Sequence, residues 1–266
     1  MNKTQQLLEV GLVRWKEWED QFLEAEDWLS KTEEQVKSFH QLQNTLIDKK
    51  NALEEFQVDL QTIFDWQQYL DKLNLKAQIL LETCADSRVS NTVTQLMTKY
   101  SALLSLAKEV IRRLELHYQE HQQHNALYQE CEEWIEQTSD KIIKLSAVNF
   151  NLDEVNAQLL AIKPLKQTLE QGQNKLRYVL ELKEKVMLTT EPSGATKIQE
   201  EAVLLEAEFE KLMLDVQDLR QRLSTRASLL EDLEKSKKII SEWLNDIESK
   251  VLYAIIVNMF RVLPFF

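Results

Sequence analysis

The sequence predicts an all-α protein made of tandem left-handed three-helix bundles, and three observations carry that prediction. The 266 residues include only 3 glycines and 3 prolines, too few for the many turns of a sheet-rich fold. A content of 44% hydrophobic and 29% charged residues excludes a disordered chain. Apolar residues recur at alternating steps of three and four over long stretches, which is the heptad pattern of helices packed side by side.

An internal repeat organises these helices. Trp28, Trp134 and Trp243 stand in similar segments that lie 106 and 109 residues apart. A shift of 106 residues also superposes eight further positions of heptad spacing, and a long period of this kind indicates tandem structural units. The superposed pairs are Trp15 and His121, Trp18 and His124, Phe22 and Tyr128, Ala25 and Cys131, Leu29 and Ile135, Thr32 and Thr138, Val36 and Ile142, and Phe39 and Leu145.

Polar stretches divide the first repeat into three helices. A break at 40–47 ends the first helix, the second helix spans 48–83, and a break at 84–91 precedes the third. Asp48 and its counterpart Asp153 are expected to be N-caps, because an aspartate at that position accepts hydrogen bonds from the free N–H groups of the first turn.

The third helix of the first repeat is expected to continue directly into the second repeat. Its heptad runs from 93 to 142 without glycine or proline, so it predicts one uninterrupted helix. The second repeat has breaks at 146–153 and 189–196, and a further heptad runs from 198 to 247. Pro164 lies in the helix between these two breaks, where it removes a backbone donor and is expected to kink the helix.

The period sets the expected domain boundaries. Residues 1–12 are the end of a preceding repeat, 13–118 form one repeat, and 119–227 form the next. The first helix of an incomplete repeat follows at 228–250. An atypical apolar tail occupies 251–266, where acidic residues and the heptad both stop.

These features together resemble the spectrin repeat, over essentially residues 1–250. The resemblance rests on the period, on the helix that joins one bundle to the next, and on a tryptophan followed by leucine or isoleucine in each first helix. These pairs are Trp28-Leu29, Trp134-Ile135 and Trp243-Leu244. The segments FLEAEDWLSK and YQECEEWIEQT look most like the rod of a large nesprin, with other spectrin-repeat proteins left open.

The resemblance implies a structural rod, spacer and interaction scaffold, of the kind that links the nuclear envelope to the actin cytoskeleton. It implies protein partners from the cytoskeleton or the nuclear envelope. It also implies a location in the cytoplasm, on the cytoskeleton and at the outer face of the nuclear envelope. The family's actin-binding calponin-homology domains and membrane-spanning tail find no matching residues in this sequence.

The six residues of the Trp-Leu and Trp-Ile pairs are expected to be core anchors. Trp28 and Trp134 lie beside the heptad positions, where the other two helices of a bundle can bury them. Removing such a ring typically costs about 3–5 kcal/mol. Trp15, Trp18 and Trp66 are read in the same way, as core or half-buried packing, in preference to aromatic rings that stack on a ligand.

Polar residues occupy the heptad where one repeat passes into the next. His117, His121 and His124 share one helix face, and Arg226 stands as far before Trp243 as His117 stands before Trp134. These four residues predict an inter-repeat junction that is softer than the bundles. Zinc binding by two histidines four residues apart is an alternative, and softening near the imidazole pKa of about 6.5 is another.

No catalytic site, cofactor or metal site is predicted, and the chain is expected not to be an enzyme. Cys84 and Cys131 have no partnering cysteine or histidine motif. Acidic runs such as 130–133 fit solvated helix faces, and glycine is too scarce for a phosphate-binding loop. The net charge of −12 argues against nucleic-acid binding and against anionic membranes. The first residues do not form a signal peptide, and the cysteine usage suits a reducing compartment.

The C-terminal part leaves alternatives open. The apolar face of 228–250 has no following helices to cover it, which predicts self-association through 228–266. The tail at 251–266 is short of the roughly 20 residues that span a bilayer. It is read as an alternative or truncated chain end, or as a segment that binds a membrane surface or a partner. Alternative functions are therefore an adaptor that recruits one partner through a helical face, and a peripheral membrane protein.

Overall fold

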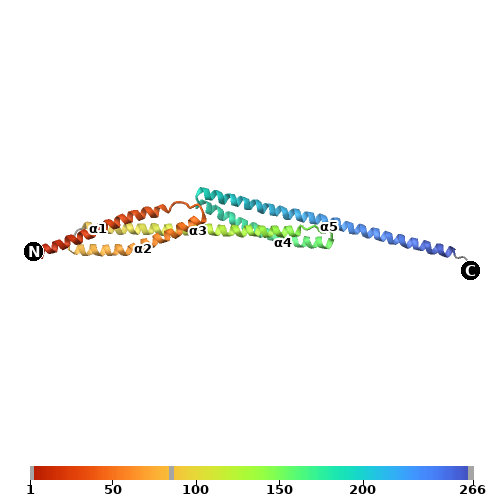
Figure 1. The fold of residues 1–266 in the computed structure, drawn as a ribbon, viewed down its shortest axis with the longest axis horizontal. Coiled ribbons are helices and arrows are strands. Elements are labelled where there is room, and N and C mark those ends of the chain that lie inside the picture. The colour runs from red at the N-terminus through yellow and green to blue at the C-terminus, as the bar shows by residue number, and fades with distance from the viewer. Residues whose placement is uncertain (1–2, 84–86, 263–266) are drawn as a thin grey trace. The chain divides into compact units, whose positions relative to one another are not determined.

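A computed structural model describes residues 3–83 and 87–262, and all of its regular elements there are α-helices, as the sequence predicts. Figure 1 shows α1 and α2 beside the first part of α3, and α4 and α5 beside its later part. The helices are α1 (Lys3–Ser38), α2 (Leu46–Thr83), α3 (Ser87–Leu145), α4 (Leu152–Leu188) and α5 (Pro192–Val262).

The helix that was expected to pass from one repeat into the next is present. α3 is a single helix of 59 residues and contains no turn. It begins at Ser87, so residues 87–91 are helical where a break was expected, and 84–86 lie outside the described residues. α4 continues as a helix through Pro164.

α5 is a helix of 71 residues and extends through 251–262, past the point where the heptad ends. The helix therefore continues beyond the last residue of the apolar heptad pattern. Over the described residues, none of the helices is both long and apolar enough to cross a membrane.

The N-cap predictions for Asp48 and Asp153 are wrong by a few residues. Thr45 caps α2: its hydroxyl accepts the Asp48 N–H at 3.1 Å, and the Asp48 carboxylate accepts the Thr45 N–H at 3.0 Å. This reciprocal pair is a capping box, with Asp48 in the first turn. α4 is capped by Asn151, whose side-chain oxygen accepts the Asp153 N–H at 2.9 Å. Both aspartates still lie where a carboxylate favours the positive end of the helix dipole.

The chain divides into two compact units, and each unit combines two segments that are separated in the sequence. Unit 1 takes in the described residues of 1–127 together with 179–202, and unit 2 takes in those of 128–178 and 203–266. The predicted repeat boundaries follow the sequence period rather than these contacts, and they stay predictions.

The core of unit 1 joins α1, α2 and the first part of α3. Tyr69 on α2 donates a hydrogen bond to Glu24 on α1 at 2.8 Å, and Tyr100 on α3 donates to the backbone oxygen of Ile63 on α2 at 2.9 Å. Between these contacts lies a continuous apolar interior. Its most deeply buried members are Ala25, Val36, Phe56, Ile63, Leu70, Ala107 and Val110.

Aromatic rings cover one side of that interior. Trp28 stacks face to face on Trp66, with ring centroids 4.1 Å apart and planes at 9°. Trp18 is buried and stacks on Phe22, while Trp15 is half-buried. Leu29, the neighbour of Trp28, is 4% exposed.

Unit 2 packs the later part of α3 against α4 and α5. The half-buried Trp134 lies over Gly172 of α4 and stacks near Phe209 of α5, with ring centroids 5.9 Å apart. Ile135 beside it is buried.

The third tryptophan pair has a different setting from the other two. Trp243 is 59% exposed and Leu244 is 47% exposed, because no described segment packs over this part of α5. Neither residue is a core anchor in this structure. The anchor role of the whole set remains a prediction for a bundle that covers them.

Candidate functional site

A fully buried lysine lies at the start of α2. Lys49 is 1% exposed, and its ammonium group donates hydrogen bonds to the hydroxyls of Thr189 at 3.1 Å and Thr190 at 3.0 Å. Thr190 in turn donates to the Val186 carbonyl at the end of α4. All these residues belong to unit 1, so a buried charge there is satisfied by hydroxyls that follow α4.

The segment before α2 docks on the segment between α4 and α5. Gln43 and Thr190 form a parallel β-bridge, and the Glu191 N–H donates to the Gln43 carbonyl at 3.0 Å. The Ser193 hydroxyl donates to the side-chain oxygen of Asn44 at 2.9 Å. We call residues 43–45 and 189–194, together with Lys49, the loop latch.

Close approach in the loop latch requires a glycine. A Cβ atom added at Gly194 would overlap the backbone oxygen of Asn44, and it would also press on its side-chain oxygen and on Thr190. Backbone cannot give way as the end of a flexible side chain can, so any larger residue would force the two segments apart.

The three predicted junction histidines lie in the same unit as the loop latch. His121 and His124 are buried at 8% and 4% exposure, and His117 is half-buried. The Nδ1 atom of His121 has no hydrogen-bond partner within the described part of the chain. Burial, and then the Lys49 charge, lower the pKa of His121 to about 4. Burial also lowers the pKa of the other two, so the cluster favours neutral imidazoles.

Burial also affects Lys49, the fully buried lysine of the loop latch. Burial lowers the pKa of Lys49 to about 8, and Glu120 opposes this in part. Lys183, also buried, donates to Gln199 on α5 at 2.9 Å and pairs with Glu184 at 3.0 Å. The site therefore concentrates basic groups that few carboxylates balance.

This chemistry suits a structural joint better than a metal site. The Lys49 ammonium group lowers the pKa of both His117 and His121 by its charge, and the same charge opposes a bound cation. Within the described residues, no cluster of three or more histidine, cysteine or acidic side chains is placed to hold a metal ion.

Two other predicted residues belong to unit 2, whereas the loop latch belongs to unit 1. Arg226 is half-buried and belongs to unit 2. Cys131 is buried in unit 2, and burial raises the pKa of its thiol, which disfavours the reactive thiolate. Cys84 lies outside the described residues.

Lys49 was not predicted, although the sequence carries a signal for it. The buried residues of α2 recur every seven positions, and Lys49 occupies the first of these positions. The series is Lys49, Phe56, Ile63, Leu70 and Ala77. A lysine at a heptad position that is normally apolar indicates that its ammonium group has a specific polar partner.

The fold defines the chain as an all-α protein with a spectrin-like helical-bundle architecture. The chain is 55% identical over 251 residues, 94% of its length, to Muscle-specific protein 300 kDa of Drosophila melanogaster. It is 23% identical over 237 residues, 86% of its length, to human Nesprin-3.

These matches confirm the predicted resemblance to a nesprin-like rod, and the chain is a homologue of part of the first protein. It spans only 2% of the length of Muscle-specific protein 300 kDa and 24% of Nesprin-3. No protein-family profile matches the chain.

Proposed function

We propose that the chain is a mechanical spacer within a structural scaffold linked to the cytoskeleton, and that it has no enzymatic activity. Its homology to a muscle-specific large protein and to Nesprin-3 supports this role. The expected repeats at 13–118 and 119–227 would be its units, with 228–250 the start of another. Tension would pass along α3 and be shared by the loop latch.

The loop latch is the observation that carries the proposal. It holds a backbone-to-backbone hydrogen bond, a glycine contact and a fully buried lysine in one unit. A joint built only to connect two helices needs none of these. Buried polar contacts such as the one between Lys49 and Thr190 are costly to leave unpaired, so separating the two segments under load is resisted.

Single-molecule stretching of the full chain, held by tags at both ends, tests the role. We expect stepwise unfolding with about 32 nm gained per repeat, which is the extended length of 106 residues at about 3.5 Å each less a folded length of about 5 nm. The Gly194→Ala substitution is expected to lower the force of one step. Gly11→Ala is the matched control, because a Cβ atom there meets nothing within 4 Å.

The milder Ser193→Ala variant guards against a Gly194 variant that does not fold. It removes only the hydrogen bond to Asn44. The unfolding force of its affected step is expected to lie between that of the unchanged chain and that of Gly194→Ala. Equal unfolding forces in all four chains would contradict a force-bearing role for the loop latch.

We further infer, from the resemblance to nesprins, a place at the outer face of the nuclear envelope with actin-linked partners. The distant match to Nesprin-3 supports this inference. Antibodies against this segment are expected to label the nuclear rim of intact cells. Labelling confined to another structure would contradict this location and leave the mechanical role standing.

We also infer self-association through 228–266, because the described part of that stretch keeps an uncovered apolar stripe. Trp243 and Leu233 are 59% and 63% exposed, and large exposed apolar patches mark interaction sites. Light scattering is expected to give a mass above that of the monomer for 1–266 and the mass of the monomer for 1–227. Monomer masses for both chains would discard the inference.

A further inference from the structure

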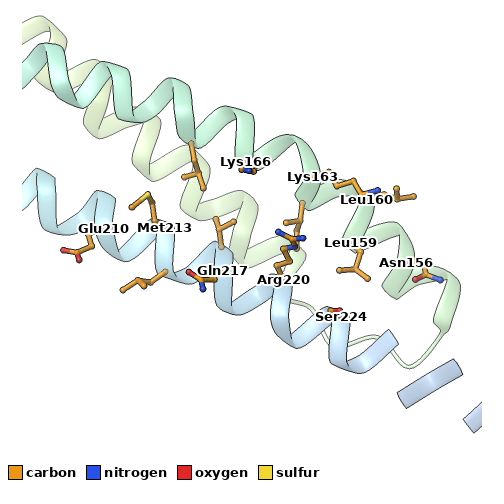
Figure 2. Close-up of a pocket in the computed structure, with 14 residues that line it drawn as sticks. Asn156, Leu159, Leu160, Lys163, Lys166, Glu210, Met213, Gln217, Arg220 and Ser224 are labelled. Atoms are coloured by element: carbon orange, nitrogen blue, oxygen red, sulfur yellow. The ribbon is translucent and has the colours of Figure 1, made fainter. Parts of the chain in front are cut away.

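An apolar groove of about 1150 Å³ runs between α4 and α5 in unit 2. Figure 2 shows both helices contributing side chains to it. Ile162 and Val216 are buried members of its lining. Leu160, Met213 and Leu214 also line it and are 62%, 40% and 60% exposed. A surface that keeps such side chains in water is a candidate for a partner.

The groove has the length of a short helix. Its lining extends from Asn156 to Leu169 on α4 and from Glu210 to Ser224 on α5. At 1.5 Å per residue each wall is about 20 Å long, or close to four helical turns. The walls run in opposite directions, since Asn156 and Ser224 lie at one end in Figure 2 and Glu210 at the other. A lining that extends for about 20 Å along two helices suits a helix better than a compact ligand.

The charge of the groove is opposite to that of the chain. Lys163, Lys166 and Arg220 line it with Glu210 as the single carboxylate, while the chain as a whole carries −12. None of the three cations forms an ion pair with another described residue. The second groove of unit 2 is strongly acidic by contrast. It includes Glu132, Glu133, Glu136, Asp140, Glu208 and Asp215 beside Lys211.

We propose that this groove binds an acidic amphipathic helix of a partner protein. Apolar residues on one face of that helix would pack between Leu160 and Leu214, and its flanking carboxylates would pair with the three cations. Met213 supplies a flexible side chain that fits anchors of different shape. The inference does not depend on the mechanical role of the loop latch.

A second copy of the chain is a poorer occupant on charge grounds. Its helical segment at 228–262 carries six acidic and five basic residues, so it offers almost no net negative charge to the groove. A partner helix rich in glutamate matches both the apolar lining and the three cations.

Fluorescence anisotropy with the full chain tests the proposal. The probe is a labelled 18-residue helical peptide with leucines at i, i+3, i+7 and i+10 and glutamates on both flanks. We expect saturable binding that the triple variant Lys163→Glu, Lys166→Glu, Arg220→Glu weakens by about tenfold or more. Leu214→Ser is expected to weaken it as well, which general charge attraction does not predict.

The matched control carries Lys16→Glu, Lys72→Glu and Lys108→Glu, three exposed cations of unit 1 with the same change in charge. It is expected to bind the peptide as the unchanged chain does. Equal weakening in both triple variants, or no binding to the unchanged chain, overturns the proposal. A chain dimer that only the groove variant dissociates also overturns it, in favour of a second copy.

Discussion

Units 1 and 2 place a tryptophan at the same repeat position and give it different partners. In unit 1, Trp28 stacks on Trp66. A shift of 106 residues carries Trp28 to Trp134 and Trp66 to Gly172, and in unit 2 Trp134 lies against Gly172. One ring thus packs on a ring, and the other fills the space that a missing side chain leaves. The repeat therefore keeps the tryptophan of the first helix and changes the residue that packs against it.

The same shift relates a second pair of contacts. Tyr69 donates to Glu24 in unit 1, and the equivalent Lys175 donates to Glu130 in unit 2. A phenol and an ammonium group therefore make the same bridge between corresponding helices. Together the two comparisons indicate that the heptad sets where helices touch, while individual side chains decide how tightly each bundle is filled.

The largest expected effect is at the stacked pair of unit 1. Trp66→Ala removes the ring that covers Trp28, and we expect a loss of about 3 kcal/mol in the free energy of unfolding. Denaturant unfolding followed by tryptophan fluorescence measures it. Trp243→Ala is the control, because that ring is 59% exposed. An equal loss in both variants would contradict the importance of the stack.

The next effect is on the pH dependence of stability, and it arises in unit 1, which contains His121. Because the pKa of His121 is lowered to about 4 in the folded chain, the unfolded chain binds more protons between pH 6.5 and 4. Stability therefore falls as the pH falls through that window, by about 2 kcal/mol between pH 6.5 and 4.5. His121→Leu is expected to flatten this part of the profile, measured by urea unfolding at each pH.

The exposed His40 provides the control for that pH profile. His40→Leu is expected to leave the slope of stability against pH unchanged. A wild-type slope in the His121→Leu variant would show that another group causes the acid sensitivity.

A smaller effect concerns the glycine of unit 2. In Gly172→Ala the new methyl group would overlap the ring of Trp134, and such overpacking costs about 1–3 kcal/mol. The gain in helix propensity, about 1 kcal/mol, offsets part of this. Calorimetry is expected to show a lower melting temperature for Gly172→Ala and a slightly higher one for Gly11→Ala. A rise in both would mean that the ring moves aside without cost.

The sequence predicts the helices well because their signals are local. Heptads and polar breaks place the start of α2 and of α4 within two residues. The caps were missed because Thr45 and Asn151 stand just before the two predicted aspartates, and all three residue types favour caps or first turns.

The site was predicted only in part, because docking of distant segments leaves little local signal. The histidines were found from their break in the apolar pattern. Gly194 was not, since its need for a small residue arises only when Asn44 lies against it. Lys49 could have been found from its heptad position, but its threonine partners lie about 140 residues away in sequence and follow from the tertiary fold.

The smallest expected effect distinguishes the two equivalent bridges by salt. Double-mutant cycles with Tyr69→Phe and Glu24→Gln, and with Lys175→Met and Glu130→Gln, measure the coupling within each pair. We expect each coupling to be about 0.5 kcal/mol, since exposed pairs contribute little. Raising the salt concentration to about 1 M shortens the screening length to about 3 Å.

Salt is therefore expected to reduce the Lys175–Glu130 coupling more than the Tyr69–Glu24 coupling, because only the former joins two full charges. Burial and then the hydrogen bond to Glu24 raise the pKa of Tyr69 to about 12, so its phenol stays neutral across the neutral pH range. Equal salt dependence in the two cycles would mean that the repeat position, and not the charge of the side chain, determines the strength of the bridge.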